Sequence, residues 1–210
     1  MLTRIIPAVA AMAAIVAASN ILVQFPVQAQ LGGLNLADLL TWGAFTYPVA
    51  FLVTDLTNRH FGASAARLVV LAGFVLAVLI SFYLATPRIA IASGSAFLLA
   101  QLADVAIFDR LRASAWWRAP LLSSLLGSMV DTVLFFSLAF SEGFSALGSA
   151  DGFAIEATPL LGIFVLELPR WVSWALGDFG VKVLVALVML LPYSVLRLWI
   201  ADLVVHPASK

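Results

Sequence analysis

The stretch AARLVVLAGFVLAVLISFYL, residues 65–84, decides the fold class of this chain. It carries one charged side chain, Arg67, and is long enough to cross a bilayer, which takes about 20 mostly apolar residues in a helix. Its apolar residues run continuously rather than alternating with polar ones, so a transmembrane β-strand is not expected. The stretch therefore predicts a membrane-spanning α-helix.

Five further stretches have the same character, so we predict an all-α integral membrane protein, a bundle of six transmembrane helices in one transmembrane domain, residues 1–210. The six predicted spans are residues 5–27, 36–53, 65–84, 89–108, 120–140 and 181–201. The first stretch also resembles a signal peptide after Arg4. We favour a span because the apolar run continues past Asn20 to Pro26.

The connections between the predicted spans are short, except for residues 141–180. Alternation of the spans places this long loop on the outer, periplasmic side, where its acidic residues suit exposure to water. Within it, residues 159–168 are apolar but too short to cross the membrane. They favour an interfacial or re-entrant segment.

The composition excludes several classes of protein. Hydrophobic residues make up 63% of the chain and charged residues 10%, with a mean hydropathy of +1.10. Soluble domains have about 45–50% apolar and about 25% charged residues, so a soluble enzyme or a disordered chain is not expected. The 11 basic and 11 acidic residues balance, which gives no reason to expect a nucleic-acid partner.

The residues that most often bind metals and cofactors are scarce. The chain has no cysteine, which excludes disulfides, thiolate metal sites and iron–sulfur clusters. Its two histidines are His60, expected at the surface of a loop, and His206 in the tail. We therefore predict no metal site and no cofactor.

The basic residues indicate the orientation of the predicted bundle. If the spans alternate, eight basic residues fall on one side of the membrane, against Arg88 and Arg170 on the other. The eight are Arg4, Arg59, Arg67, Arg110, Arg112, Arg118, Arg197 and Lys210. Because cytoplasmic loops carry an excess of Lys and Arg, both termini are predicted to be cytoplasmic.

Charged residues inside the predicted spans point to a functional site. Asp131 lies near the middle of the fifth span, Asp104 about one turn from the cytoplasmic end of the fourth, and Lys182 at the outer start of the sixth. Each charge at the centre of a spanning helix costs about 2.5–3.5 kcal/mol on insertion scales. These side chains must therefore face each other, a cavity or a ligand.

Helical spacing groups these residues with other polar side chains. Asn20 and Gln24 are four residues apart, and Gln101 and Asp104 are three apart, so each pair shares a helix face. Polar stripes turned inward would enclose a small polar chamber. Lys182 neutralises one carboxylate at most, which leaves Asp104 or Asp131 for a proton, water or a ligand. Among aromatic neighbours, such a carboxylate suits a flat ligand with a fork of N–H donors, as in guanine-like bases, amidines and other heterocycles.

Most of these residues also have a purely structural interpretation, as interhelical hydrogen bonds, local ion pairs or packing. It applies to Asn20 and Gln24, to the pairs Asp178–Lys182 and Asp55–Arg59, and to Trp42, Phe45 and Phe135. It is weakest for Asp131, which is deep in its span and has no cation nearby in the sequence.

Several motifs resemble a known family. They are residues 20–26 (NILVQFP), 41–62 with TDLTNRHFG at its end, 88–112 with QLADVAIFDRLR at its end, 116–140 with WWRAP followed by GSMVDTVLFF, and 182–193 with its Pro–Tyr ending. Together they resemble the YhhQ-type (VUT) family of queuosine precursor transporters, in order and over most of the chain. The long loop before Asp178 has no counterpart in the resemblance.

The resemblance implies a bacterial inner-membrane importer of the 7-deazaguanines preQ0 (7-cyano-7-deazaguanine) and preQ1 (7-aminomethyl-7-deazaguanine), which are precursors of the modified tRNA base queuosine. On this hypothesis, Asp131 or Asp104 accepts the N1–H and exocyclic amine of the base through both carboxylate oxygens. Asn20, Gln24, Gln101 or Lys182 would bind O6 and the ring nitrogens, and the plane of the base would stack on Trp42 or Phe45. Asp55 and Arg59 would form a gate pair at the cytoplasmic end of the second span.

Other classes stay open at this point. A substrate-binding subunit of an energy-coupled vitamin-type transporter, carrying another heterocycle, would also be a small six-helix protein, but it would need an ATPase partner. A membrane enzyme would need a nucleophile–base pair or a metal set in the spans, which two histidines and no cysteine do not supply. A scaffold would bind no small molecule. A chain this small could also work as a homodimer.

Overall fold

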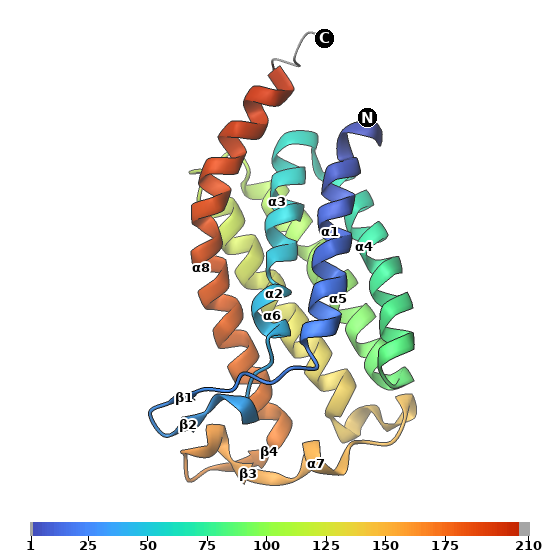
Figure 1. Cartoon of the computed structure of the whole chain (residues 1–210), viewed down its shortest axis with the longest axis vertical. Coiled ribbons are helices and arrows are strands. Elements are labelled where there is room, and N and C mark those ends of the chain that lie inside the picture. The colour runs from blue at the N-terminus through green and yellow to red at the C-terminus, as the bar shows by residue number, and fades with distance from the viewer. Residues whose placement is uncertain (1, 206–210) are drawn as a thin grey trace.

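The structure, a computed structural model, describes residues 2–205, which places His206 and Lys210 outside it. Six helices of more than ten residues form a bundle, in which they run side by side (Figure 1). They are α1 (Leu2–Leu22), α3 (Val49–Phe61), α4 (Ala63–Leu84), α5 (Pro87–Leu111), α6 (Arg118–Phe140) and α8 (Arg170–Val205). The beginning of α1 and the end of α8 lie at the same end of the bundle (Figure 1).

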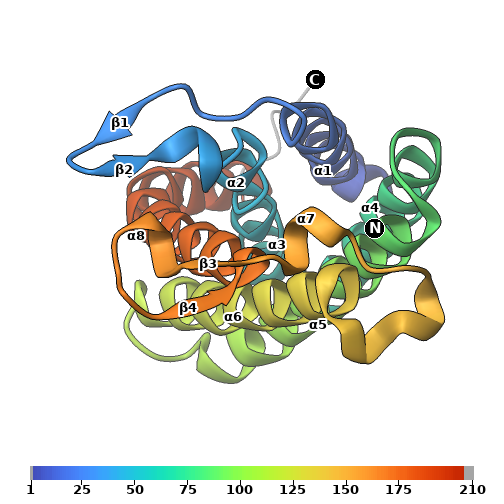
Figure 2. The ribbon, with the colours of Figure 1, turned by 90° about the horizontal axis from the view of Figure 1, so that it is seen from below.

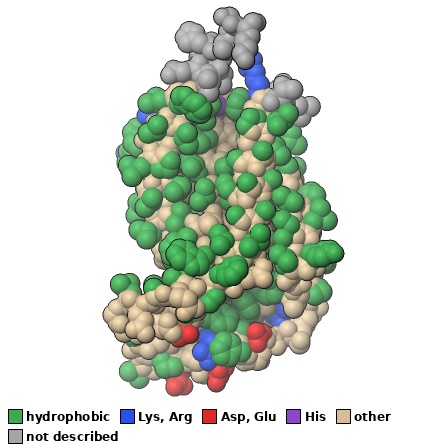
Figure 3. Space-filling view, in the orientation of Figure 1, with side chains coloured by type: hydrophobic (Ala, Val, Ile, Leu, Met, Phe, Trp, Pro, Cys, Tyr) green, Lys and Arg blue, Asp and Glu red, His purple; other side chains and the backbone are tan. Residues whose placement is uncertain are grey.

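Five of these helices are long and apolar enough to cross a membrane: Arg4–Leu22, Ala63–Leu84, Pro87–Leu111, Arg118–Phe140 and Arg170–Ala201. Hydrophobic side chains cover the helices on the face seen in Figure 3, and acidic side chains gather at the end that carries the loops. On α4, Leu71, Val75 and Leu79 are exposed, as expected where lipid surrounds a protein. The helical membrane class is confirmed, with five candidate spans among the described residues.

The predicted second span, residues 36–53, is wrong in its bounds. Residues 36–38 form a 3-10 turn, η1 (Leu36–Asp38), and the helix begins later, as α2 (Gly43–Thr46) followed by α3. Pro48 separates the two pieces, because proline lacks the N–H that a continuous helix needs. The helix then continues beyond Val53 to Phe61 because the polar residues that end the apolar run, Asp55 and Asn58 among them, are buried within the protein.

The predicted last span, residues 181–201, begins too late. Helix α8 starts at Arg170, so part of the predicted long loop is helical. Asp178 interrupts the apolar pattern without interrupting the helix, because Thr132 and Lys182 satisfy its carboxylate inside the bundle. The other predicted spans match helices, with ends that differ by a few residues.

The remaining loop contains no re-entrant helix. Residues 159–168, predicted as an interfacial or re-entrant segment, belong to a hairpin of β3 (Ala157–Pro159) and β4 (Glu167–Pro169), with the 3-10 turn η3 (Leu160–Gly162) between them. Its tip is apolar and open, with Val165 99% exposed, so an interfacial position stays a prediction. Before it come the 3-10 helix η2 (Glu142–Leu147) and α7 (Gly152–Ile155).

A second hairpin, β1 (Gln30–Leu31) with β2 (Leu34–Asn35), lies at the same end of the bundle. Viewed onto this end, α7 and the β3–β4 hairpin cross the ends of the helices (Figure 2). Two hydrogen bonds tie η3 and η1 to α8: the backbone N–H of Leu161 in η3 donates to Ser173 Oγ at 2.9 Å, and Trp174 Nε1 donates to the carbonyl of Asp38 in η1 at 2.8 Å. We call the end of the bundle that carries α7 and the two hairpins the loop end of the molecule.

Arg88 at the start of α5 anchors the segment that leads from the end of α6 to α7. Its side chain is 5% exposed and donates hydrogen bonds to the carbonyls of Leu138, Ser141 and Gly148, at 2.9, 2.6 and 2.9 Å. Leu138 lies in the last turn of α6 and Ser141 directly follows the helix, where carbonyls have no partner within the helix. One buried arginine therefore caps α6 and fixes the loop that follows it.

Candidate functional site

A cavity of about 540 Å³ opens among the helices beneath the loop end. Its walls come from α1, α2, α5, α6 and α8, together with η1 and α7. Its polar side chains are Ser19, Asn20, Asp38, Thr41, Tyr47, Ser93, Asp131, Arg170, Asp178 and Lys182. The volume lies within the range of roughly 300–1,000 Å³ that is common for small-molecule sites. We call it the outer cavity.

Lys182 is the charged centre of the outer cavity. Its Nζ donates to Asp131 Oδ2 at 2.6 Å and to Asp178 Oδ2 at 2.5 Å. The lysine is 3% exposed and Asp131 5%, so this ion pair is buried, whereas the pair with Asp178 is partly buried. One ammonium faces two carboxylates, which leaves an excess of negative charge when all three are ionised. The site therefore favours a ligand that brings N–H donors or a positive charge.

Two hydroxyl groups complete this centre. Tyr47 donates from its hydroxyl to Asp131 Oδ1 at 3.0 Å. Thr132 accepts from Lys182 Nζ at 3.1 Å and donates to Asp178 Oδ2 at 2.8 Å. The network joins α6, α8 and the residue at the break between α2 and α3. Each oxygen of Asp131 accepts one hydrogen bond, and a carboxylate oxygen has capacity for a further donor.

Among the predicted binding residues, Asn20, Asp131 and Lys182 lie in the wall of the outer cavity. Asn20 is partly committed, because its Nδ2 donates to the Val16 carbonyl and its Oδ1 accepts from Ser81. Gln24 is exposed and donates weakly to the Asn20 carbonyl at 3.4 Å. It does not line the cavity.

The aromatic residues predicted to stack on a base do not line the outer cavity. Trp42 is 48% exposed and contacts Phe45, with 5.6 Å between ring centroids. The cavity is instead lined by Phe135, Phe136, Phe140, Phe153 and Trp174. They form a connected group, in which Phe140 and Trp174 are 5.5 Å apart and Phe153 and Trp174 are 6.1 Å apart. The aromatic wall is therefore built by the end of α6, α7 and the start of α8.

Arg170, the first residue of α8, holds α7 and the residue after it at the mouth of the cavity. Its guanidinium lies 4.0 Å from the ring centroid of Phe153 and donates to Glu156 at 2.6 Å. All three residues lie at the loop end, where α7 passes over the helices (Figure 2). The long loop, which the family resemblance did not account for, thus supplies part of the wall.

Gln101 and Asp104, predicted for the same chamber, belong to a second polar region deeper in the bundle. Both are 0% exposed. Gln101 Oε1 accepts from Thr54 at 2.6 Å, whereas neither oxygen of Asp104 accepts a bond from a clear donor. Asp55 is a neighbour of Asp104 in this region, and its Oδ1 accepts a hydrogen bond from Ser123 at 3.3 Å. The single predicted chamber is therefore two sites, and we call the second the inner cluster.

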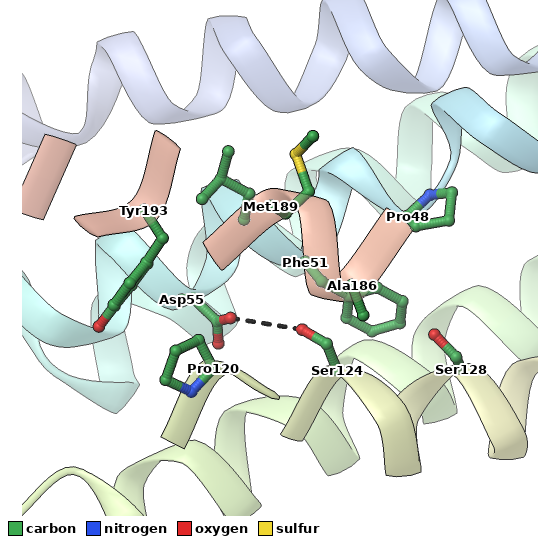
Figure 4. Close-up of a pocket in the computed structure, with 10 residues that line it drawn as sticks. Pro48, Phe51, Asp55, Pro120, Ser124, Ser128, Ala186, Met189 and Tyr193 are labelled. Atoms are coloured by element: carbon green, nitrogen blue, oxygen red, sulfur yellow. Dashed lines mark hydrogen bonds between the residues drawn. The ribbon is translucent and has the colours of Figure 1, made fainter. Parts of the chain in front are cut away.

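A small cavity of about 10 Å³ adjoins the inner cluster (Figure 4). Asp55, Ser124, Ser128 and Tyr193 supply its polar lining, between α3, α6 and α8. Ser124 donates to Asp55 Oδ2 at 3.4 Å, drawn as the dashed line in Figure 4, and Ser128 Oγ has no hydrogen-bond partner among the described residues. Within the described part of the chain, no group of three or more His, Cys, Asp or Glu side chains is arranged to hold a metal ion.

Asp55 and Arg59, predicted as a gate or structural ion pair, form no ion pair with each other in the structure. Asp55 turns toward the serines of α6. Arg59 donates from Nε to the Tyr193 hydroxyl at 3.0 Å and from Nη1 to the Arg112 carbonyl at 2.7 Å. The spacing of four residues places them on one side of α3, but each finds a partner on a different helix.

The sequence interpretation did not select Tyr47 and Thr132, although both contact the charged centre. Tyr47 carried a usable signal, since a tyrosine directly before Pro48 places a polar tip at a helix break. Thr132 follows Asp131 in the sequence, and only the position of Lys182 on α8 shows that its hydroxyl faces the ion pairs. Asp178 was recognised as a neighbour of Lys182 but not assigned to the site.

Comparison with known proteins identifies relatives. The model of the family described as "Putative vitamin uptake transporter" matches residues 41–86 and 81–196. The chain is 37% identical over 204 residues to the "Queuosine precursor transporter" of Escherichia coli (strain K12), covering 87% of this chain and 81% of the relative. It is 36% identical over 205 residues to the "Probable queuosine precursor transporter" of Haemophilus influenzae, covering 85% and 79%. No solved structure matches the chain.

Proposed function

We propose that this chain, which belongs to the family of putative vitamin uptake transporters, is a transporter that carries queuosine precursors into the cell. Its relatives come from bacteria and it has several long apolar helices, so it is a multi-pass protein of the bacterial inner membrane. Both relatives are named as transporters, which are not enzymes. A substrate-binding subunit of an energy-coupled transporter is therefore not favoured.

The observation that carries the proposal is the buried Asp131–Lys182–Asp178 centre in the wall of the outer cavity. A 7-deazaguanine presents N1–H and an exocyclic amine on one edge, and Asp131 can accept both. Lys182 or the free N–H of Asn20 would donate to O6. This selects Asp131 rather than Asp104 for the edge of the base, because Asp104 does not line the outer cavity.

The aromatic wall supports the same substrate class. A flat heterocycle gains from an offset or edge-to-face contact with aromatic rings. We assign this contact to Phe135, Phe140 and Trp174 in place of Trp42 and Phe45. PreQ1 carries a cationic aminomethyl group, and Asp178 and Asp38 in the same cavity provide carboxylates for it. Both preQ0 and preQ1 are therefore proposed substrates.

We also propose that α2 and α3 together form a sixth span. Residues 43–61 would extend about 28 Å as a helix, close to the roughly 30 Å hydrocarbon core of a bilayer. The pair lies alongside α1 and α8 in the bundle (Figure 1). A break within a span is compatible with a membrane where it is buried in protein or lines a cavity, as Tyr47 does here.

Expression in a bacterial strain that neither makes nor imports queuosine precursors tests the proposed function. If the chain imports them, supplying preQ0 or preQ1 in the medium restores queuosine in the tRNA of that strain. An empty vector and a strain supplied with guanine are the controls. Absence of queuosine, with the protein present in the membrane, would contradict the proposal.

A further inference from the structure

The inner cluster contains two buried acids that the proposed binding of a base leaves unused. Asp55 is 2% exposed and Asp104 is 0% exposed. Among the described residues the salt bridges involve other acids, so no basic side chain pairs with either carboxylate. Two carboxylate charges without a cation are strongly disfavoured in a low-dielectric interior. A proton or a small cation therefore has to accompany the two carboxylates.

The contacts of the two acids are those of a pair that holds a proton. Asp55 on α3 and Asp104 on α5 are buried neighbours, and Ser123 on α6 donates to Asp55 Oδ1 at 3.3 Å. Neighbouring buried carboxyl groups without a cation favour sharing one proton, because two like charges in a low-dielectric interior repel each other. The pair joins three helices, so its charge state affects how those helices pack.

A polar line on α6 connects this pair with the outer cavity. Asp131, Ser128 and Ser124 recur at helical spacing and share one face of α6. Along the axis they span about 10 Å. Ser128 is 0% exposed, has no hydrogen-bond partner within residues 2–205, and lines the small cavity together with Asp55 (Figure 4). That cavity is about the size needed for one water molecule.

The opposite side of the inner cluster leads toward the end of the bundle where α8 finishes. Tyr193 lines the same small cavity and accepts a hydrogen bond from Arg59. Arg59 in turn contacts the carbonyl of Arg112, in the connection between α5 and α6. The charged groups around the pair are thus Arg59 of α3 and, beside Tyr193 on α8, Arg197. The small cavity, with the hydroxyl groups of Ser124, Ser128 and Tyr193 in its wall, therefore lies between the outer cavity and these arginines.

We propose that Asp55 and Asp104 form a proton-binding site that couples uptake of the base to entry of a proton. The inference rests on the proposed transport function. A proton enters from the outer side, is held between the two carboxyl groups, and leaves on the cytoplasmic side past Tyr193. The base itself is unchanged. One positive charge therefore moves inward for each molecule of neutral preQ0.

Purified protein in proteoliposomes tests the coupling, with radiolabelled preQ0 and a pH-sensitive dye inside the vesicles. An inward proton gradient should drive accumulation of preQ0 above its outside concentration, with acidification of the lumen that depends on preQ0. A protonophore should abolish both. An inward sodium gradient at equal pH should drive neither.

The variants separate coupling from binding. Asp104→Asn and Asp55→Asn should lose gradient-driven accumulation at least tenfold and keep exchange of preQ0 across the membrane without a gradient. Asp109→Asn, an exposed acid paired with Arg112, is the matched control and should behave like the wild type. If neither variant can be purified in folded form, the preQ0-dependent proton flux of the wild type still tests whether uptake is coupled to a proton.

The outcomes distinguish the two proposals. Exchange of preQ0 without any effect of the proton gradient, or accumulation driven by sodium, would overturn the proton site and leave the transport function standing. Gradient-driven accumulation that persists in Asp104→Asn and Asp55→Asn would also overturn the assignment to these residues. Absence of preQ0 exchange in the wild type would instead contradict the proposed function.

Discussion

Asp131 connects three parts of the bundle through its two carboxylate oxygens. One accepts from Tyr47 at the α2–α3 break and the other from Lys182 on α8, while the residue itself belongs to α6. Lys182 also pairs with Asp178, so the removal of one carboxylate charge leaves the lysine with a partner. The charge of Asp131 can thus be changed without leaving a buried ammonium alone, which makes this residue the most informative to substitute.

We expect Asp131→Asn to lower uptake of preQ0 about ten- to hundredfold with the folded protein retained. A hydrogen bond to a charged group contributes about 1.5–3 kcal/mol, and each 1.4 kcal/mol corresponds to a factor of ten. Initial uptake rates, with protein amounts measured by blot and monodispersity by gel filtration, test this. Normal uptake by Asp131→Asn would remove it from the binding site.

Lys182→Met should destabilise the protein rather than affect binding alone. It leaves Asp131 and Asp178 without their cation, and breaking a buried ion pair typically costs about 3–5 kcal/mol. The melting temperature in detergent should fall, and the double variant Lys182→Met/Asp178→Asn should recover part of the loss because one buried charge is gone. A melting temperature unchanged by Lys182→Met would show that the ion pairs contribute little to stability.

At the scale of the elements, the length of an apolar run predicts where some helices lie but not the break between α2 and α3 or the early start of α8. Apolar run length predicted the positions of α4, α5 and α6 well, because these helices face lipid along one side. It failed where a span carries buried polar residues, as in α3, or where an acid is neutralised by another helix, as Asp178 is. Hydropathy records the cost of a polar group but not the partner that offsets it.

The contact between α1 and α2 depends on Gly43. A Cβ atom there would lie 2.9 Å from the Cα of Val23, a backbone atom that cannot turn away. Gly43→Ala should therefore destabilise the protein by about 1–3 kcal/mol, as overpacking does, and lower its melting temperature in detergent.

Gly180 is the matched control for Gly43. It lies inside α8 with nothing within 4 Å of an added Cβ, so Gly180→Ala should be neutral or stabilising by about 0.5–1 kcal/mol. Equal melting temperatures for Gly43→Ala and the wild type would show that α1 and α2 are free to separate.

At the scale of the whole molecule, the two ends of the bundle differ in charge and in structure. Seven of the eight basic residues counted for the cytoplasmic side lie within the described chain, and they belong to segments at the end where α1 begins and α8 finishes (Figure 1). The hairpins and the mouth of the outer cavity lie at the other end. We therefore propose that the loop end faces the periplasm and both termini face the cytoplasm.

The lack of cysteine makes this orientation simple to test, because an introduced cysteine is the only thiol in the protein. Val165→Cys at the exposed hairpin tip should react in intact spheroplasts with a membrane-impermeant maleimide. Ala115→Cys, exposed between α5 and α6, should react only after the membrane is permeabilised. The reverse pattern would invert the proposed orientation.

The site could be predicted from the sequence only in part. Charged residues inside apolar spans identified Asp131 and Lys182, since the membrane makes such residues costly without a partner or a role. The separation of Asp104 and Gln101 from them could not be predicted, because it depends on how far along the bundle each residue lies and which way each helix is turned. The aromatic wall also comes from segments that the apolar pattern assigned to a loop, such as Phe153 and Trp174.

The most direct test of the central claim, that the outer cavity binds a queuosine precursor through Asp131, is ligand-dependent thermal stability of the detergent-purified protein. PreQ0, preQ1, guanine and an unrelated vitamin such as riboflavin should be compared over a range of concentrations. We predict saturable stabilisation by preQ0 and preQ1, none by riboflavin, and loss of the deazaguanine effect in Asp131→Asn. No stabilisation by either deazaguanine, or equal stabilisation of wild type and Asp131→Asn, would contradict the account.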